Sequence, residues 1–146
     1  MQHPRRWAGN WQAVAPPGAV AIQLPGSRRR VKDVRCRLLS LPAGAPVVLR
    51  ADSLGAKARC RRLLSSARVR IEREYIALPS SQAPGYLVQD SPAGLGYFFH
   101  SVVSIPAGSS LAGSILRAGL VVFALMGGDA ILGGLAPGRV VVGRRI

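Results

Sequence analysis

Short runs of apolar residues, bounded by Pro, Gly or Ser, recur along the chain and predict strands. Residues 18–24 and 47–51 are almost continuously apolar, which is typical of strands buried on both faces. Residues 69–78 have the longest strand pattern, and residues 86–88 a brief one. Residues 139–146 contain three consecutive valines, so both faces of this last strand are apolar. We expect it to be covered on both sides and to pair antiparallel with residues 69–78, at an open edge of that strand.

The strand at residues 69–78 alternates in polarity, and the alternation assigns its side chains to two faces. One predicted face consists of Val69, Ile71, Arg73, Tyr75 and Ala77. Glu72 and Glu74 would share the opposite face, where a pair of carboxylates can do acid–base chemistry. Because Arg70 and Arg73 stand between and beside them, we interpret the glutamates instead as part of a solvated, salt-bridged face.

The segments between these strands have helical spacing. Ser27 is the predicted N-cap of a first helix, whose apolar face is Val31, Val34, Leu38 and Leu41. Ser53 is the predicted N-cap of a second helix at residues 54–66, whose apolar face is Ala56, Cys60, Leu63, Leu64 and Ala67. Ser91 and Pro92 begin a third helix that runs through Phe98 to Val103, and residues 110–127 form a fourth.

Strands and helices that alternate in this order predict an α/β fold. We expect a partial Rossmann-like sheet with an antiparallel C-terminal strand and a helical insert. Residues 1–17 form an irregular N-terminal segment, in which Trp7 and Trp11 are candidate anchors. Residues 18–146 form one domain, and the few strands look like half of a doubly wound sheet.

Positive charge is concentrated in the first half of the chain. The 146 residues include 20 Lys and Arg against six Asp and Glu, and 16 of the cations lie in residues 1–73. This bias favours an anionic partner such as a nucleic acid, an acidic membrane surface or a phosphorylated precursor. The alternative is a GC-rich codon bias, which enriches Arg, Ala, Gly, Pro and Val together. After Trp11, aromatic residues are not interleaved with the arginines, which argues against a nucleic-acid partner.

The sequence contains no complete set of catalytic, cofactor-binding or metal-ligating residues. The glycine pairs at 127–128 and 133–134 do not follow a strand in the dinucleotide-binding frame, and no Walker A lysine is present. His100 has serines nearby but no third group to orient it as a base. Cys36 and Cys60 are too few for a disulfide framework or a zinc site. We therefore expect no bound cofactor or metal, and structural roles for these residues.

The apolar segment at residues 111–135 raises the question of a membrane. It exceeds the roughly 20 residues that a spanning helix needs, but it contains Arg117 and Asp129, each costing about 2.5–3.5 kcal/mol at the bilayer centre. Its uninterrupted part, residues 118–128, fits a buried or interfacial helix better. With no signal peptide pattern at the start, we expect a cytoplasmic protein. The alternative is a small basic membrane-associated protein that uses residues 111–135 and needs detergent, not salt, for release.

Residues 53–146 resemble the C-terminal half of class I S-adenosylmethionine-dependent methyltransferases. The similar pieces are the helix at 54–66, ARVRI at 67–71 leading into EYIALPS at 74–80, PGYLV at 84–88, YFF at 97–99 and LAPGRVVVG at 135–143. The LPS and PGYLV pieces are most similar to methyltransferase-like proteins of cell-surface polysaccharide or glycolipid pathways. The resemblance implies a helix before the sixth strand, an insert after it that covers the substrate site, and an antiparallel seventh strand.

The cofactor elements of that family would lie before residue 1. They are an acidic, Gly-rich loop after the first strand and an acid at the end of the second. The resemblance therefore implies a fragment without its own cofactor site, either a remnant or one part of a split protein that modifies cell-surface glycans. A partner chain would complete the sheet. No catalytic residue carries over, so we do not expect the chain to be a self-sufficient enzyme.

Overall fold

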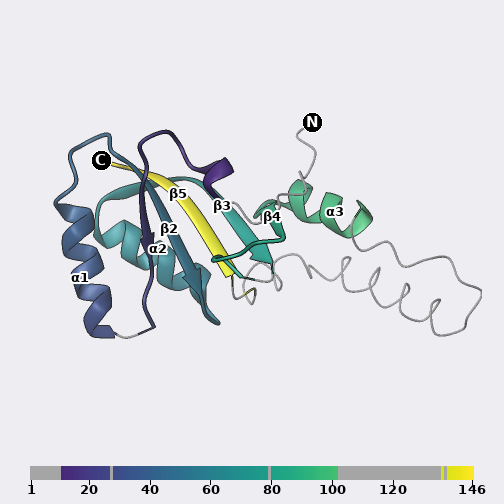
Figure 1. The fold of residues 1–146 in the computed structure, drawn as a ribbon, viewed down its shortest axis with the longest axis horizontal. Helices are drawn as coiled ribbons and strands as arrows, with labels where there is room; N and C mark the ends of the chain where they lie inside the picture. Colours follow the sequence, from purple (N-terminus) through teal and green to yellow (C-terminus); the bar gives the residue numbers. More distant parts are fainter. Residues whose placement is uncertain (1–10, 27, 79, 102–135, 137) are drawn as a thin grey trace, which may run out of the picture.

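The structure, a computed structural model, describes residues 11–26, 28–78, 80–101, 136 and 138–146. Its α/β fold contains a five-stranded open sheet (Figure 1). The strands are β1 (Val20–Gln23), β2 (Pro46–Asp52), β3 (Val69–Leu78), β4 (Tyr86–Gln89) and β5 (Gly138–Arg145). The helices are the 3-10 turn η1 (Trp11–Val14), α1 (Arg28–Leu39), α2 (Ala56–Ser66) and α3 (Pro92–Ser101). The predicted α/β class is confirmed, and each predicted strand is present.

The strands follow the order β1-β2-β5-β3-β4 across the sheet. β1 and β2 are parallel, whereas β5 is antiparallel to both of its neighbours, β2 and β3, and β4 is antiparallel to β3. Strands β1, β2 and β3 therefore run in one direction, with β5 inserted between two of them.

The predicted antiparallel pairing of the last strand with residues 69–78 is confirmed, from Val69 opposite Arg145 to Ala77 opposite Gly138. β5 also pairs with β2 along its length, so it lies inside the sheet with a partner strand on each side. Its central position agrees with the burial of every residue from 138 to 143. A strand with a neighbour on each side and apolar cover on both faces has no exposed positions left for polar residues.

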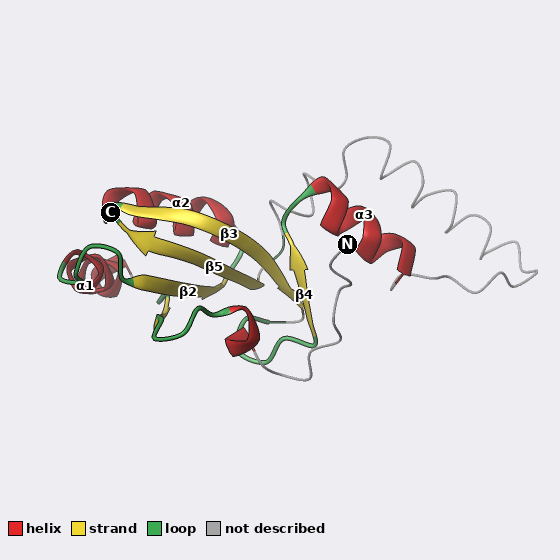
Figure 2. Ribbon diagram, turned by 90° about the horizontal axis from the view of Figure 1, so that it is seen from above, coloured by secondary structure: helices red, strands yellow, loops and turns green. Residues whose placement is uncertain are grey.

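Helices α1 and α2 cover one face of the sheet (Figure 2). The apolar faces predicted for the two helices are confirmed, because these residues pack against sheet residues in one core cluster. Leu38 of α1 and Leu64 of α2 are almost fully buried there, together with Leu49 of β2 and Val141 of β5. We call this side of the sheet the helix face.

The opposite face of the sheet is covered by the N-terminal segment that contains η1 (Figure 2). Trp11 and Val14 pack there against a second cluster that includes Val48, Val140 and Val142. Trp11 is thus confirmed as an anchor, whereas Trp7 lies outside the described residues. The three central valines of β5 divide between the two faces, as the sequence predicted.

A β-bulge divides β3 into two parts whose side chains alternate in different phases. The register with β5 shifts between Ile71 and Arg73. Val69 and Ile71 therefore pack in the helix-face cluster, whereas Tyr75 and Ala77 pack in the cluster on the opposite face. The prediction of one shared face for these residues was wrong, because one extra residue reverses every later side chain of a strand.

Two of the predicted helix caps can be compared with the structure. Ser91 Oγ accepts a hydrogen bond from the Gly94 amide at 3.1 Å, as a capping serine does. Ser53 is not the cap of α2: the N-cap is Gly55, which has a left-handed conformation and makes no side-chain cap bond. The Ser53 carbonyl instead accepts from the Ala56 amide at 3.0 Å.

Helix α3 lies at the β4 end of the sheet (Figure 1). Leu95 and Phe98 pack there with Tyr86 and Val88 of β4, and the Tyr86 and Phe98 rings meet edge to face at 5.8 Å. The predicted helix at 110–127 and the apolar segment at 111–135 lie outside the described residues. Within the described part of the chain, no helix is both long and apolar enough to cross a membrane.

Candidate functional site

The strongest candidate site lies where β2 and β3 end and β5 begins. Because β2 and β3 are parallel, their carboxyl ends meet at this edge, which is where open α/β sheets bind ligands. In the register, Gly138 lies between Asp52 at the end of β2 and Ala77 near the end of β3. A Cβ atom at Gly138 would lie 2.2 Å from the Ala77 carbonyl oxygen, so only glycine fits here.

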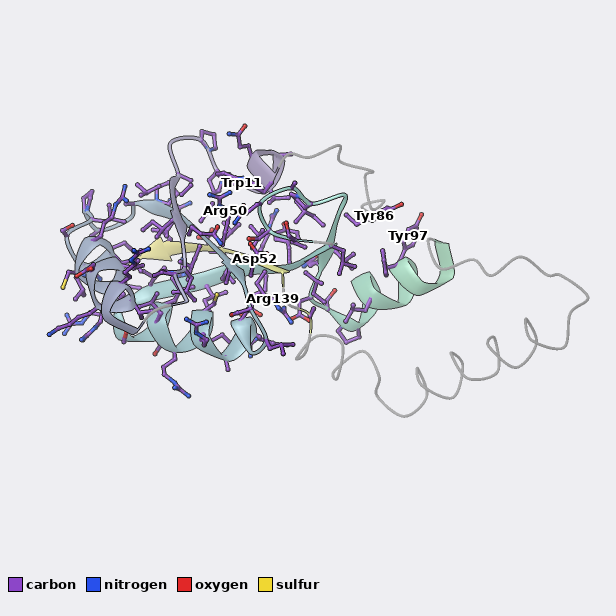
Figure 3. The ribbon with its side chains drawn as sticks, turned by 60° about the horizontal axis from the view of Figure 1, so that its bottom comes forward. Trp11, Arg50, Asp52, Tyr86, Tyr97 and Arg139 are labelled. Atoms are coloured by element: carbon purple, nitrogen blue, oxygen red, sulfur yellow. The ribbon has the colours of Figure 1, made fainter. Side chains whose placement is uncertain are left out.

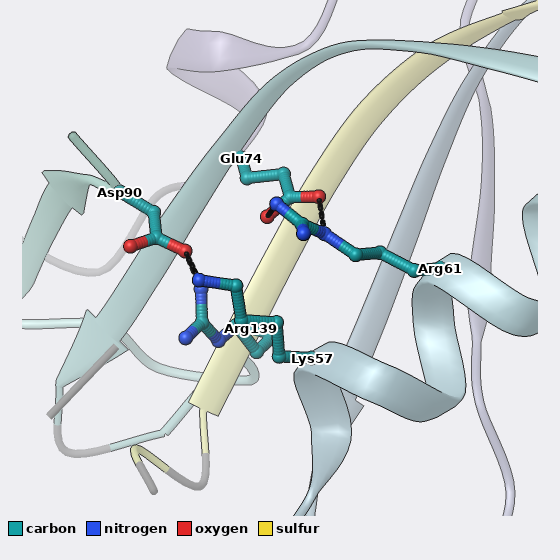
Figure 4. A network of polar contacts seen from close by, with 5 residues as sticks. All are labelled: Lys57, Arg61, Glu74, Asp90 and Arg139. Atoms are coloured by element: carbon teal, nitrogen blue, oxygen red, sulfur yellow. Dashed lines mark hydrogen bonds and ion pairs between the residues drawn. The ribbon is translucent and has the colours of Figure 1, made fainter. Parts of the chain in front are cut away.

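Arg139 follows this glycine, and its side chain is fully buried on the helix face. Its register neighbours are Ala51 and Ile76, both almost fully buried. The Arg139 Nη1 atom donates to Asp90 Oδ2 at 2.6 Å, and the Nζ atom of Lys57, in the first turn of α2, lies 2.8 Å from the same oxygen (Figure 4). The exposed side-chain fractions are 0% for Arg139, 6% for Asp90 and 26% for Lys57.

A second ion pair joins α2 to β3 beside this one. Arg61 Nε donates to Glu74 Oε1 at 2.7 Å, and Arg61 Nη2 donates to Glu74 Oε2 at 3.0 Å. Such a two-nitrogen, two-oxygen contact is the strongest geometry of an arginine–carboxylate pair. We refer to Lys57, Arg61, Glu74, Asp90 and Arg139 together as the Arg139 network (Figure 4).

The charges of the network keep Asp90 ionised. Burial acts to raise the pKa of Asp90, but the hydrogen bonds from Lys57 and Arg139 and their positive charges outweigh it, so the pKa lies below its ordinary value. The hydrogen bond to Glu74 likewise raises the pKa of Arg61. A carboxylate held in this form accepts hydrogen bonds and does not donate a proton at neutral pH, which argues against a general-acid role for Asp90.

A smaller polar cluster connects the end of β2 to the loop after β3. The Asp52 carboxylate accepts from the Ser81 amide at 2.6 Å and from Ser81 Oγ at 2.7 Å. It also accepts a longer bond, 3.3 Å, from Gln23 Nε2 at the end of β1. Ser81 is fully buried. The cluster therefore fixes the loop after β3 at the carboxyl edge of the sheet.

Replacing Ser81 by alanine is expected to lower the free energy of unfolding by about 1.5 kcal/mol. That is the lower end for a hydrogen bond to a charged group, because Asp52 is exposed and can rehydrate. The neighbouring Ser80 is the matched control: its Oγ accepts only two long bonds of 3.3 Å. We expect Ser80→Ala to stay within about 0.5 kcal/mol. Urea unfolding measures both changes, and equal losses would contradict the cluster's role.

On the opposite face, an arginine of β2 lies beneath the N-terminal segment. The guanidinium carbon of Arg50 lies 4.4 Å from the centre of the Trp11 ring, a cation–π contact (Figure 3). Among the described residues, Arg50 Nε and Gln23 Oε1 are buried without a hydrogen-bond partner. Arg50 and Gln23 are opposite one another in the register of β1 and β2. The contact holds the N-terminal segment onto the sheet.

The residues considered from sequence are dispersed in the structure. Glu72 and Glu74 do not act as a pair: Glu72 accepts from Arg144 of β5 at 3.0 Å, whereas Glu74 is held by α2. The prediction that they share a face was wrong, because the bulge separates them. Their interpretation as salt-bridged residues is confirmed.

Neither cysteine forms part of a site in the described structure. Both thiols are free, with Cys36 exposed and Cys60 buried on the side of α2 that packs against the sheet. Burial raises the pKa of the Cys60 thiol to about 12, so it is not a nucleophile at neutral pH. No group of residues in the described ranges could hold a metal ion. The His100 side chain and the glycine pairs at 127–128 and 133–134 lie outside what the structure describes.

Sequence reasoning missed Arg139 and Asp90 as a site, although a signal was present. Arg139 precedes three valines in a strand predicted to be buried, so its side chain had to be buried as well. A buried arginine needs an acidic partner, and only six acids were available. The fold supplies Asp90 from a position 49 residues away.

No known family model, curated protein or solved structure matches the chain. What is established is an α/β protein with a mixed, open five-stranded sheet and a buried ion-pair network at its carboxyl edge.

Proposed function

We propose that this chain is the C-terminal half of a class I methyltransferase-like fold, and that it works with a second chain or segment carrying the cofactor site. In this proposal the chain is not an enzyme by itself. It supplies the far side of the sheet and the insert on the substrate side. The assignment of cell-surface glycans as substrates rests on the sequence resemblance alone.

The observation that carries the proposal is the position of the last strand. The resemblance requires a helix, a strand, an insert and then an antiparallel final strand. The chain has α2, then β3, then an insertion that begins with β4 and α3, and finally β5, antiparallel to β3. The final strand also lies antiparallel beside β2, so it stands reversed between two strands, β2 and β3, that run in one direction.

Two further features support the idea of a half. Both crossover helices, α1 and α2, pack on the same face, whereas a complete doubly wound sheet has helices on both. In the described structure, β1 is an edge strand that pairs only with β2. The Leu24 amide donates to the Arg50 carbonyl at 2.7 Å, so the backbone groups of Leu24 point toward β2. In a parallel ladder, successive residues point their N–H and C=O groups to opposite sides. The backbone groups of Ala21 and Gln23 therefore point away from β2. These groups can accept a further strand.

The proposal predicts that the chain alone does not bind S-adenosylmethionine. The physical reason is that no glycine-rich turn follows a strand of this sequence, so the backbone cannot approach the ligand closely. Calorimetric titration of the purified chain should give no heat of binding. The same titration on the complex that the tagged chain forms in extracts of its native cells should give saturable binding. Binding by the chain alone, or none by the complex, would each contradict the proposal.

A further inference from the structure

The Arg139 guanidinium is buried, and three of its five N–H donors, those on Nε and Nη2, are unused in the described structure. Nη1 donates to Asp90, but Nε and Nη2 have no hydrogen-bond partner among the described residues. Almost all buried polar groups in native proteins are paired, and an unpaired donor costs about 1–3 kcal/mol, or more when it is charged. Two such donors on one fully buried side chain therefore call for an acceptor.

The neighbouring ion pair indicates which kind of acceptor fits the free edge of Arg139. Arg61 uses its Nε and Nη2 atoms to hold the two carboxylate oxygens of Glu74. The same two nitrogens are unpartnered on Arg139. This edge of a guanidinium matches two oxygens of one carboxylate or phosphate group.

The charge around Arg139 also favours an anion. Lys57 and Arg139 contribute two positive charges and Asp90 one negative charge, which leaves a net charge of +1. The Arg61–Glu74 pair beside them is neutral. The first turn of α2 contains no acidic residue, and its N-cap makes no side-chain bond, so the helix terminus adds partial positive charge.

We propose that the Nε and Nη2 edge of Arg139 binds an oxyanion of a small ligand, either a carboxylate or a phosphate group. Lys57, which shares Asp90 with Arg139, adds positive charge to the same network. The site lies at the carboxyl ends of β2 and β3. Arg139 is closed to solvent, whereas Lys57 of the same network is partly exposed. The inference does not rest on the proposed methyltransferase relationship, because it uses only the charges and geometry of this chain.

The direct test follows the Nε–H signal of Arg139 by NMR while acetate or inorganic phosphate replaces chloride at constant ionic strength. A saturable shift is expected with at least one of the two anions, and the anion that binds more tightly identifies the oxyanion class. A signal that does not respond to either anion would show that the edge faces an internal water, and would overturn the proposal.

Variants separate this site from general charge effects. Arg139→Lys retains the positive charge but loses the two-nitrogen edge, so it should weaken anion binding by about ten-fold or more. Arg144→Lys is the matched control, because Arg144 is an exposed arginine of the same strand, and it should leave the affinity unchanged. Equal affinities in the two variants would contradict the proposal. If Arg139→Lys does not fold, Lys57→Met, which removes only the partly exposed cation, must weaken the Arg139 response.

Discussion

Deleting residues 139–146 is expected to abolish the cooperative folding of this protein. The deletion removes nearly all of β5, the strand that holds β2 and β3 together, and so divides the sheet into two parts. Val140, Val141 and Val142 are almost fully buried, and burial of each contributes about 1.5–3 kcal/mol. The total is comparable to the whole stability of a typical domain, about 5–15 kcal/mol.

Thermal unfolding followed by circular dichroism tests this prediction. The deleted chain should show no cooperative transition and should aggregate, because β2 and β3 would expose unpaired edges. Deletion of Ile146 alone is the control, because this residue is exposed and lies beyond β5. A truncated chain that remains soluble and keeps the melting transition of the full-length protein would contradict the central role of β5.

Replacing Asp90 by alanine is expected to lower the free energy of unfolding by about 3–5 kcal/mol, the usual cost of breaking a buried ion pair from one side. Asp90 is the only acid within salt-bridge distance of Arg139 among the described residues. Without it, Arg139 stays buried with an uncompensated charge, whereas Lys57 can turn toward water. The additional change Arg139→Met should recover most of the loss, because an apolar side chain of similar length needs no partner.

The pH dependence of this effect has a definite sign. The folded pKa of Asp90 lies below its ordinary value, so its ionised form stabilises the protein above the unfolded pKa, about 3.9. This stabilisation is lost as the pH falls through the lowered folded pKa. The stability difference between the wild-type protein and Asp90→Ala, measured by urea unfolding, should therefore be full at pH 7 and shrink at strongly acidic pH. Glu72→Ala is the control, because its partly exposed pair with Arg144 should contribute less than about 1 kcal/mol.

The local pattern of the sequence was enough to predict the elements and most of the core. The apolar faces of α1 and α2 followed from helical spacing, because a helix presents residues three and four apart on one side. The three valines of β5 predicted a strand buried on both faces, and its antiparallel partner was predicted as well. The helix faces and the burial of the strand depend on neighbours in sequence, so the sequence alone determined them, whereas the pairing followed from the open edge expected of residues 69–78.

The tertiary structure decided the features that depend on contacts between distant residues. A single extra residue at the bulge in β3 reversed the faces of Tyr75 and Ala77, and no local pattern marks its position. Helix α2 connects β2 to β3, and the facing edges of these two strands need a partner. The position of β5 between them depends on this arrangement of the whole sheet. The sequence shows that Arg139 must be buried, but only the folded sheet brings Asp90 and Lys57 to it, because electrostatic pairing depends on distance in space and not along the chain.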